Sequence, residues 1–327
     1  MASAPGPRVT LWEEIKDYDH IASAAAQLAF AAGLDSELAP ATKGQAGNTD
    51  FDVEMKPPAY CITGLNEDYD TISAFWEDCL PPAPVGAGTD PGASEASAAG
   101  ADKDVESEPR SAERWYQHST WYWTRKDMTA DDVGVLGGAT HLHAPDVRHS
   151  RALLTQLREA RPSLGRSRSL DVAGGVGRVT QAVLLPHFAT VDITDVAPRL
   201  LEAAGRRIPA ASLGHLALSR MSRLCPPADL KYDCIWMQWC LGYMLDADLL
   251  GLLRRLRASL APGGVIIIKE TVTRRQALWV DASDLNIVRG VPYFEAVLRE
   301  AGLRVVMRSE MRDWPADYLP MVAWVCE

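Results

Sequence analysis

Helical and strand patterns alternate along the chain from residue 114 onward. Short apolar runs rich in Val, Ile and Leu predict buried strands, and apolar positions three and four residues apart predict helices. The predicted strands are 169–173, 190–195, 215–219, 232–239, 264–270, 303–310 and 321–327. The predicted helices are 147–160, 177–188, 197–207, 246–260 and 292–302. Such alternation predicts an α/β fold with a doubly wound, mostly parallel seven-stranded sheet, to which the C-terminal strand pair contributes one antiparallel strand.

The first third of the chain has a different pattern. Apolar residues at helical spacing in 67–80 predict a short helix, with Tyr69, Ile72, Phe75 and Trp76 on one face. Residues 81–109 consist mainly of Pro, Gly, Ala, Ser and acidic residues, and they bury too little apolar surface to offset the entropy lost on ordering. We therefore expect three parts, namely an acidic, helical N-terminal extension at 1–80, a disordered linker or insertion at 81–113, and an α/β domain at 114–327.

Charge is divided unevenly between these parts. The net charge is -10, and residues 1–113 hold 21 Asp and Glu against 6 Lys and Arg, whereas the remainder holds 22 against 27. The acidic third is expected to be a solvated segment or an arm that attracts a basic partner. An isoelectric point of about 5.2 disfavours nucleic-acid binding.

Membrane and secretory signals are absent from the pattern. No apolar run reaches the length of a membrane span, and acidic rather than basic residues precede the Ala-rich stretch 21–34. We therefore expect a cytoplasmic or nuclear protein that does not bind membranes. The six cysteines show no CxxC or Cys/His spacing, so reduced thiols and no metal site are expected.

The stretch LDVAGGVGRVTQ at 170–181 ends a predicted strand in a glycine turn and opens a helix. In an open α/β sheet this turn lies in the ligand crevice, where glycines allow the backbone to approach a ligand closely. A dinucleotide fingerprint requires GxGxxG, and counting from Gly175 puts Thr180 at the third glycine position. The methyltransferase form D/E-x-G-x-G-x-G fits Asp171 to Gly177, with Ala173 in place of the first glycine. The spacing therefore favours S-adenosylmethionine over NAD.

Two charged residues near the turn are candidates for contacts with the cofactor, and the first of them, an acid, serves NAD and S-adenosylmethionine equally. Asp195 ends the next predicted strand, where an acid accepts ribose hydroxyls or, alternatively, caps the following helix. Arg178 lies in the first helical turn, which is unfavourable for a cation, so we expect it to meet a carboxylate. The methionine part of S-adenosylmethionine supplies one.

Beyond the loop, the segments YDCIWMQWCLGYM and LAPGGVIIIKE, with VLGGATH upstream and VDASD downstream, resemble the eukaryotic α-N-terminal protein methyltransferases. These enzymes methylate the free α-amine of proteins that begin Xaa-Pro-Lys/Arg. The resemblance runs from about Trp121 to the end of the chain. It implies a class I, Rossmann-like methyltransferase fold, S-adenosylmethionine as the cofactor, and protein or peptide substrates with basic N-termini; we also expect a monomer.

The resemblance also implies roles for particular residues. The cofactor side comprises the turn, the ribose acid, the arginine on the cofactor carboxylate and the adenine contacts: Ala173, Gly175, Gly177, Arg178, Asp195, Val196, Met221, Ser222 and Gln238. The peptide channel and the groups that hold the substrate comprise Trp123, Leu136, Gly137, Trp239, Asp281 and Asn286. The expected catalytic residues, next to the amine, are Asp284, Tyr243 and Thr271.

Several substrate-side positions depart from the family pattern. Tyr243 stands where many members have histidine, Thr271 replaces an asparagine, and Ala139 lies in an LGGATH segment that is usually LGGYGH or LGGYEH. An α-amine with a pKa of about 7.7–8.0 must lose a proton before it accepts a methyl group. Asp284 is expected to draw the ammonium in and to accept its proton or relay it to water, while Tyr243 orients the nitrogen. Two alternatives remain: a small-molecule N- or O-methyltransferase, and a non-catalytic S-adenosylmethionine-binding interaction protein.

Overall fold

The computed structural model describes residues 9–11, 60–63, 67–69, 112–274, 278–281 and 284–327. Most of the expected N-terminal extension and linker therefore lies outside the described residues. Within this part of the chain, no helix has the length and apolar character needed to cross a membrane. Four described cysteines are free, and three of them are buried, whereas Cys225 is exposed.

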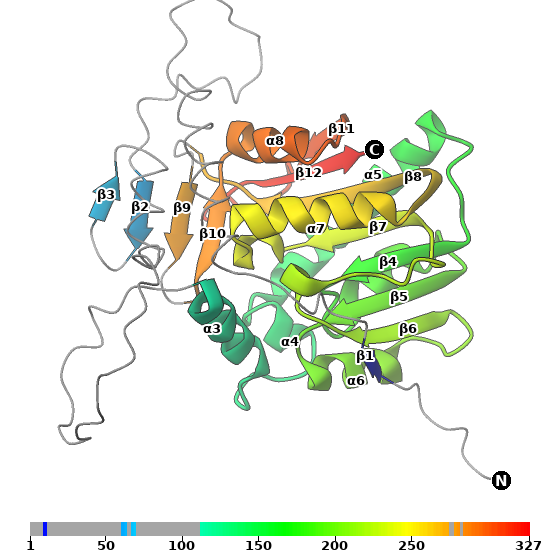
Figure 1. The fold of residues 1–327 in the computed structure, drawn as a ribbon, viewed down its shortest axis with the longest axis horizontal. Coiled ribbons are helices and arrows are strands. Elements are labelled where there is room, and N and C mark those ends of the chain that lie inside the picture. Colours follow the sequence, from blue (N-terminus) through cyan, green and yellow to red (C-terminus); the bar gives the residue numbers. More distant parts are fainter. Residues whose placement is uncertain (1–8, 12–59, 64–66, 70–111, 275–277, 282–283) are drawn as a thin grey trace, which may run out of the picture.

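A large sheet forms the centre of the molecule, and its parallel strands run side by side in Figure 1. From one edge to the other the order is β1 (Val9–Leu11), β6 (Leu213–Leu218), β5 (Thr190–Asp195), β4 (Arg168–Val172), β7 (Tyr232–Gln238), β8 (Leu260–Thr271), β12 (Met321–Cys326) and β11 (Val305–Glu310). β12 pairs antiparallel with both β8 and β11, so it alone runs in the direction opposite to the other strands of this sheet. Seven of these strands confirm the expected sheet, and β1 adds an eighth at the edge, parallel to β6.

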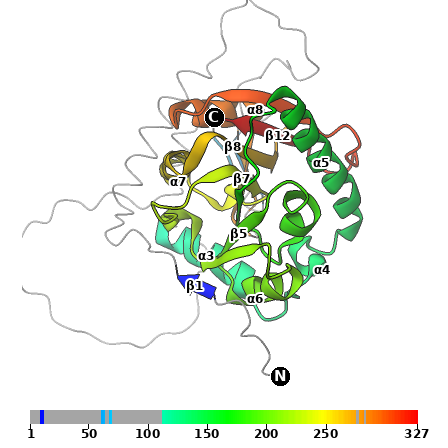
Figure 2. The same ribbon diagram turned by 90° about the vertical axis from the view of Figure 1, so that its right-hand side faces the viewer.

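Helices cover both faces of this sheet, as Figure 2 shows for α7 (Asp246–Ala258) on one side of the strands and α5 (His143–Ala160) on the other. Successive side chains of β7 enter two different cores. Ile235 packs with α7 and α8 (Val291–Glu300), whereas Trp236 packs with α5 and α6 (Pro198–Arg207). The near-continuous apolar run of β7 follows from this two-sided burial.

A smaller sheet of four strands lies beside the carboxyl ends of the parallel strands (Figure 1). Its order is β10 (Asn286–Arg289), β9 (Leu278–Asp281), β2 (Tyr60–Thr63) and β3 (Glu67–Tyr69). The helix predicted for 67–80 is wrong at its first three residues, because Tyr69 pairs with Tyr60 in an antiparallel ladder. Residues 70–80 of that predicted helix lie outside the described residues. Pairing with a distant strand overrides the local helical spacing here.

The remaining elements connect the two sheets. Helix α3 (Ala112–Thr124) includes residues 112 and 113, which the sequence assigned to the linker. The short α4 (Asp132–Val135) and a 3₁₀ turn at Thr140–Leu142 lead into α5, which begins four residues before its predicted start. Further 3₁₀ turns lie at Met221–Arg223 and Leu241–Tyr243. The last of these belongs to the site described next.

Candidate active site

Two adjoining cavities open at the carboxyl ends of the parallel strands. The inner cavity holds about 1030 Å³ of space, part of it open to solvent, and the outer one about 790 Å³. They share one wall, formed by Trp123, Val135, Trp239 and Tyr243. A group bound in either cavity therefore comes close to one bound in the other.

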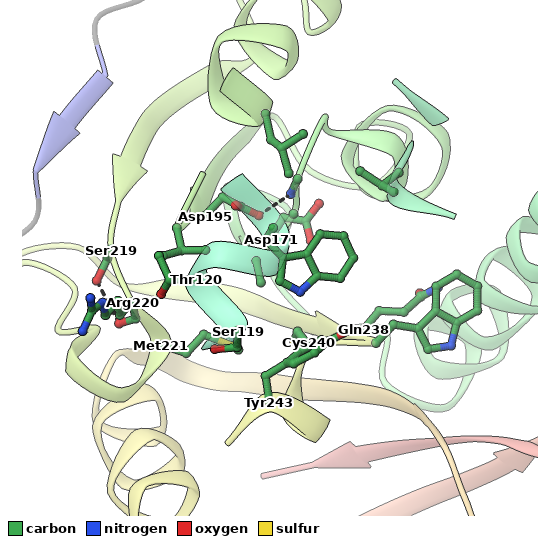
Figure 3. A pocket seen from close by; sticks show the side chains of 18 of the residues that line it. Ser119, Thr120, Asp171, Asp195, Ser219, Arg220, Met221, Gln238, Cys240 and Tyr243 are labelled. Atoms are coloured by element: carbon green, nitrogen blue, oxygen red, sulfur yellow. Dashed lines mark hydrogen bonds between the residues drawn. The ribbon is translucent and has the colours of Figure 1, made fainter. Parts of the chain in front are cut away.

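The ends of four strands build the inner cavity. Figure 3 shows Ser219, Arg220 and Met221 at one end, Gln238 at the other, and Asp195 between them. The residues predicted to contact the cofactor that line this cavity are Ala173, Gly175, Arg178, Asp195, Val196, Met221, Ser222 and Gln238. Tyr116, Ser119 and Thr120 of α3 also line it and were not predicted, whereas Trp123 of the same helix was. No local motif marks those three positions.

The glycine turn has an unusual backbone. Ala173, Gly175 and Gly177 all have positive φ angles, of 53°, 56° and 75°. Ala173 therefore adopts a left-handed conformation that is costly for a residue with a Cβ atom. Gly177 does not line either cavity among the described residues, and a Cβ atom there would lie 3.3 Å from the Ile208 side chain. Close packing against the neighbouring helix therefore explains this glycine, and contact with a ligand does not.

Asp171 joins the strand before the turn to the helix after it. One of its carboxylate oxygens accepts hydrogen bonds from the Thr180 hydroxyl at 2.6 Å and from the Thr180 N–H at 3.1 Å. Residues Thr180–Leu184 then form a π-helical segment, whereas the sequence predicted an ordinary helix over 177–188. Such segments are frequent at functional sites. Thr180, the residue that breaks the dinucleotide fingerprint, thus anchors the helix to Asp171.

Asp195 is buried at the middle of the inner cavity. Its two oxygens accept the N–H groups of Gly175 at 3.0 Å and Ala197 at 2.8 Å. Burial raises the pKa of Asp195 to about 6, although the N–H groups lower it. Each carboxylate oxygen has a second lone pair, so Asp195 retains the capacity to accept hydroxyl groups.

Arg178 pairs with a carboxylate of the protein itself, whereas the sequence predicted the carboxylate of the cofactor as its partner. Its guanidinium lies 2.7 Å from Asp146 of α5 and 5.2 Å from the centre of the Trp239 ring. Asp146 also receives hydrogen bonds from Gln238 and from Lys269 of β8. Burial alone would raise the pKa of Asp146, but the charges of Lys269 and Arg178 outweigh it and lower that pKa. Two cations face one carboxylate, so the cluster keeps a positive charge at the cavity wall.

The outer cavity gathers residues from distant parts of the chain. Those that the sequence predicted are Trp123, Leu136, Trp239, Tyr243, Thr271 and Asn286. Those that it missed include Leu142, Glu270, Trp314 and Tyr318. The ring centroids of Trp239 and Trp314 are 6.0 Å apart, and those of Trp314 and Tyr318 are 6.1 Å apart. Trp314 and Tyr318 lie in a loop with no motif of its own, so only the folded chain reveals them.

Tyr243 and Asp284 form a hydrogen-bonded pair beside this cavity. The Tyr243 hydroxyl donates to Asp284 at 3.0 Å, and the other Asp284 oxygen accepts the Asn286 N–H at 3.1 Å. Burial raises the pKa of Asp284, and the bond from Tyr243 opposes that shift. The described residues Asp281, Asp284 and Gly137 line neither of the two cavities. Asp284 therefore reaches the cavity through Tyr243.

The shared wall carries a second backbone feature. Trp239, which directly follows β7, has a φ of 55°. A bulky residue in this region is strained, and such strain is concentrated at functional sites. The Trp239 indole N–H donates to the Met321 sulfur at 2.9 Å, which fixes the ring between the cavities. Thr271 also donates to Met321, at 3.3 Å.

In the described part of the chain no group of His, Cys, Asp and Glu is arranged to hold a metal ion.

Comparison with known proteins identifies relatives of this chain. Residues 111–326 match the family model of AdoMet-dependent proline di-methyltransferases. The chain is 32% identical over 212 residues, 62% of this chain and 91% of the relative, to an N-terminal Xaa-Pro-Lys N-methyltransferase of Xenopus laevis. It is 29% identical over 221 residues, 65% of this chain and 76% of the relative, to an α-N-terminal protein methyltransferase of Drosophila melanogaster. A solved SAM-dependent methyltransferase from Leishmania major is 26% identical, with a TM-score of 0.67, covering 86% of this chain and 100% of the other.

Proposed function

Since the chain belongs to the AdoMet-dependent proline di-methyltransferase family, we propose that it methylates the free α-amino group of proteins that begin Xaa-Pro-Lys or Xaa-Pro-Arg. It is a methyltransferase of the class I fold that uses S-adenosylmethionine. The observation that carries the proposal is the wall shared by the two cavities. A methyl donor in the inner cavity and a peptide end in the outer cavity meet at Tyr243.

The residues of the inner cavity suit the parts of S-adenosylmethionine. Met221 lies at the end of the inner cavity where the adenine would bind (Figure 3), and Ser222, the next residue, also lines the cavity. Asp195 offers oxygens to the ribose hydroxyls. The positive charge left by Arg178 and Lys269 against Asp146 suits the methionine carboxylate. Ala173, Gly175 and Val196 complete the wall. When bound, this cofactor supplies an electrophilic methyl group.

Tyr243 would orient the substrate amine. Because the Tyr243 hydroxyl donates its proton to Asp284, its oxygen lone pairs remain as acceptors for an N–H of the amine. Asn286 and Thr271 line the same cavity and offer further polar contacts. Hydrogen bonds of this kind fix the nitrogen in line with the methyl group, and such positioning lowers the barrier of a two-reactant step.

Aromatic and acidic groups would hold the rest of the peptide. Trp239 and Trp123 present ring surfaces to the outer cavity, which suits the proline ring at the second position. The turn formed by Leu136 and Gly137 would border the channel. Asp281 at the end of β9, together with Asp284, would attract the basic third residue from outside the cavity.

A peptide panel tests the proposal. The protein is incubated with S-adenosylmethionine and a peptide beginning Xaa-Pro-Lys, and mass spectrometry locates the added methyl groups. We expect methylation of the α-nitrogen, and none on the same peptide with an acetylated N-terminus. Methylation of small amines alone would instead favour a small-molecule methyltransferase. Cofactor binding without turnover of any basic peptide would favour a non-catalytic binding protein.

A further inference from the structure

Glu270 places a carboxylate in the outer cavity that the function proposed above does not use. It lies near the carboxyl end of β8, is only 7% exposed, and is the single acidic residue among the described residues that line this cavity. Its neighbour Lys269 points to the opposite face of the sheet, where it binds Asp146 and Ser150. Alternation along β8 therefore directs Glu270 to the side where the peptide end would bind.

One oxygen of Glu270 is fixed by the backbone. Oε1 accepts the N–H groups of Cys240 and Leu241, both at 2.9 Å. These N–H groups begin the turn that carries Tyr243, and Figure 3 shows Cys240 and Tyr243 on the same side of the inner cavity. Within the described part of the chain, Oε2 accepts no hydrogen bond. The carboxylate is thus held in place by one oxygen, and its other oxygen is available to accept a proton.

The charges around Glu270 are few. Arg289 of β10 lies near enough to stabilise its ionised form, but Arg289 is committed to Asp246 at 2.7 Å and to two backbone carbonyls. The Cys240 thiol is the other titratable group beside it, and burial raises the pKa of that thiol well above its usual value. Burial raises the pKa of Glu270 to about 7. A carboxylate of this kind exchanges protons with an α-amine at neutral pH at little cost.

We propose that Glu270 is the catalytic residue that takes the proton from the substrate's α-ammonium group. This inference rests on the proposed function. The proton moves from nitrogen to Oε2 of Glu270, which leaves a lone pair on nitrogen. That lone pair forms the bond to the methyl carbon while the carbon–sulfur bond breaks and its electron pair stays on sulfur. The methylated nitrogen keeps two protons and the positive charge. Tyr243 and Asp284 orient the amine, and Glu270 deprotonates it.

The pH dependence of E270Q separates this role from a structural one. Glutamine keeps an oxygen for the Cys240 and Leu241 N–H groups, so the turn is retained, whereas the base is lost. We expect kcat on an Xaa-Pro-Lys peptide to fall about tenfold at pH 7, where only about one tenth of a free α-amine is neutral, with KM for S-adenosylmethionine unchanged. The rate should recover above pH 9, where the amine is neutral without a base. The matched control E310Q, on β11 away from both cavities, keeps wild-type rates. A loss of equal size at every pH, or no loss, would overturn the proposal.

A binding measurement tests the same point without turnover. Peptide is titrated into the protein saturated with S-adenosylhomocysteine at pH 6.5 in two buffers of different ionisation enthalpy, and the difference gives the protons released. The positive amine favours ionised Glu270, so wild type and D284N should release protons and E270Q should release fewer. Because D284N carries an intact Glu270, absence of release from D284N overturns the proposal even if E270Q fails to fold. Wild type that methylates no such peptide at any pH would instead refute the proposed function.

Discussion

The inner and outer cavities are built in different ways. The inner cavity is formed mainly where β4, β5, β6 and β7 end, so its lining follows from the order of strands in one sheet. The outer cavity is assembled from α3, β10, the ends of β7 and β8, and the loop that holds Trp314 and Tyr318. The pairing of adjacent strands fixes where their carboxyl ends lie, and this fixes the geometry of the inner cavity. The outer cavity depends on contacts between distant segments, which allows its specificity to change while the cofactor side stays constant.

The largest effect is expected from the charge cluster behind the inner cavity. D146A leaves Lys269 and Arg178 buried without their carboxylate, so the free energy of unfolding should fall by about 3–5 kcal/mol in urea titrations. The double variant D146A/K269M also removes one of the two cations left without a carboxylate, so it should recover part of the lost free energy of unfolding. Equal stability of D146A and wild type would show that the cluster does not support the cofactor side.

The Tyr243–Asp284 pair tests the outer cavity alone. D284N should lower kcat/KM for an Xaa-Pro-Lys peptide by about 100-fold, because the Tyr243 oxygen is no longer held by a carboxylate acceptor. Affinity for S-adenosylhomocysteine, measured by calorimetry, should stay within twofold of wild type. Because the two residues act as a unit, Y243F/D284N should lose little more than either single variant. A loss of cofactor affinity in D284N would contradict the separation of the two cavities.

A smaller effect should appear in the pH dependence of cofactor binding. Asp195 accepts the ribose hydroxyls best when ionised, and its pKa in the folded protein is about 6. Protonation then competes with the ligand below that pH, so affinity for S-adenosylhomocysteine should fall about tenfold between pH 7 and pH 5. D195N should bind more weakly than wild type at pH 7, with a flat profile over this range. A profile in D195N that still falls would assign the titration to another group.

The smallest effect concerns the turn itself. A173G should raise the free energy of unfolding by about 0.5–1 kcal/mol, because glycine adopts a φ of 53° without the clash of a Cβ atom. Thermal unfolding should show an increase of roughly 2–4 °C per kcal/mol. The matched control A152G, within α5 at an exposed position, should instead lower stability by about 1 kcal/mol. Destabilisation by both variants would show that Ala173 is not strained.

The sequence predicted the inner cavity better than the outer one for a physical reason. The strand at 190–195 has its predicted bounds, and Asp195 at its end lies beside the glycine turn, because parallel strands place their carboxyl ends together. The role of Lys269 could not be predicted, since its partner Asp146 lies 123 positions away. Trp314 and Glu270 carry no local signal of their part in the site. Distant pairings of this kind are invisible to periodicity and spacing.

A crystal structure with S-adenosylhomocysteine and an Xaa-Pro-Lys peptide would decide whether cofactor and substrate meet at the shared wall. We expect the nucleoside between Met221 and Asp195, the peptide in the outer cavity, and its α-nitrogen within hydrogen-bond distance of the Tyr243 oxygen. A peptide whose leading nitrogen lies away from Tyr243, or a nucleoside outside the inner cavity, would contradict this expectation.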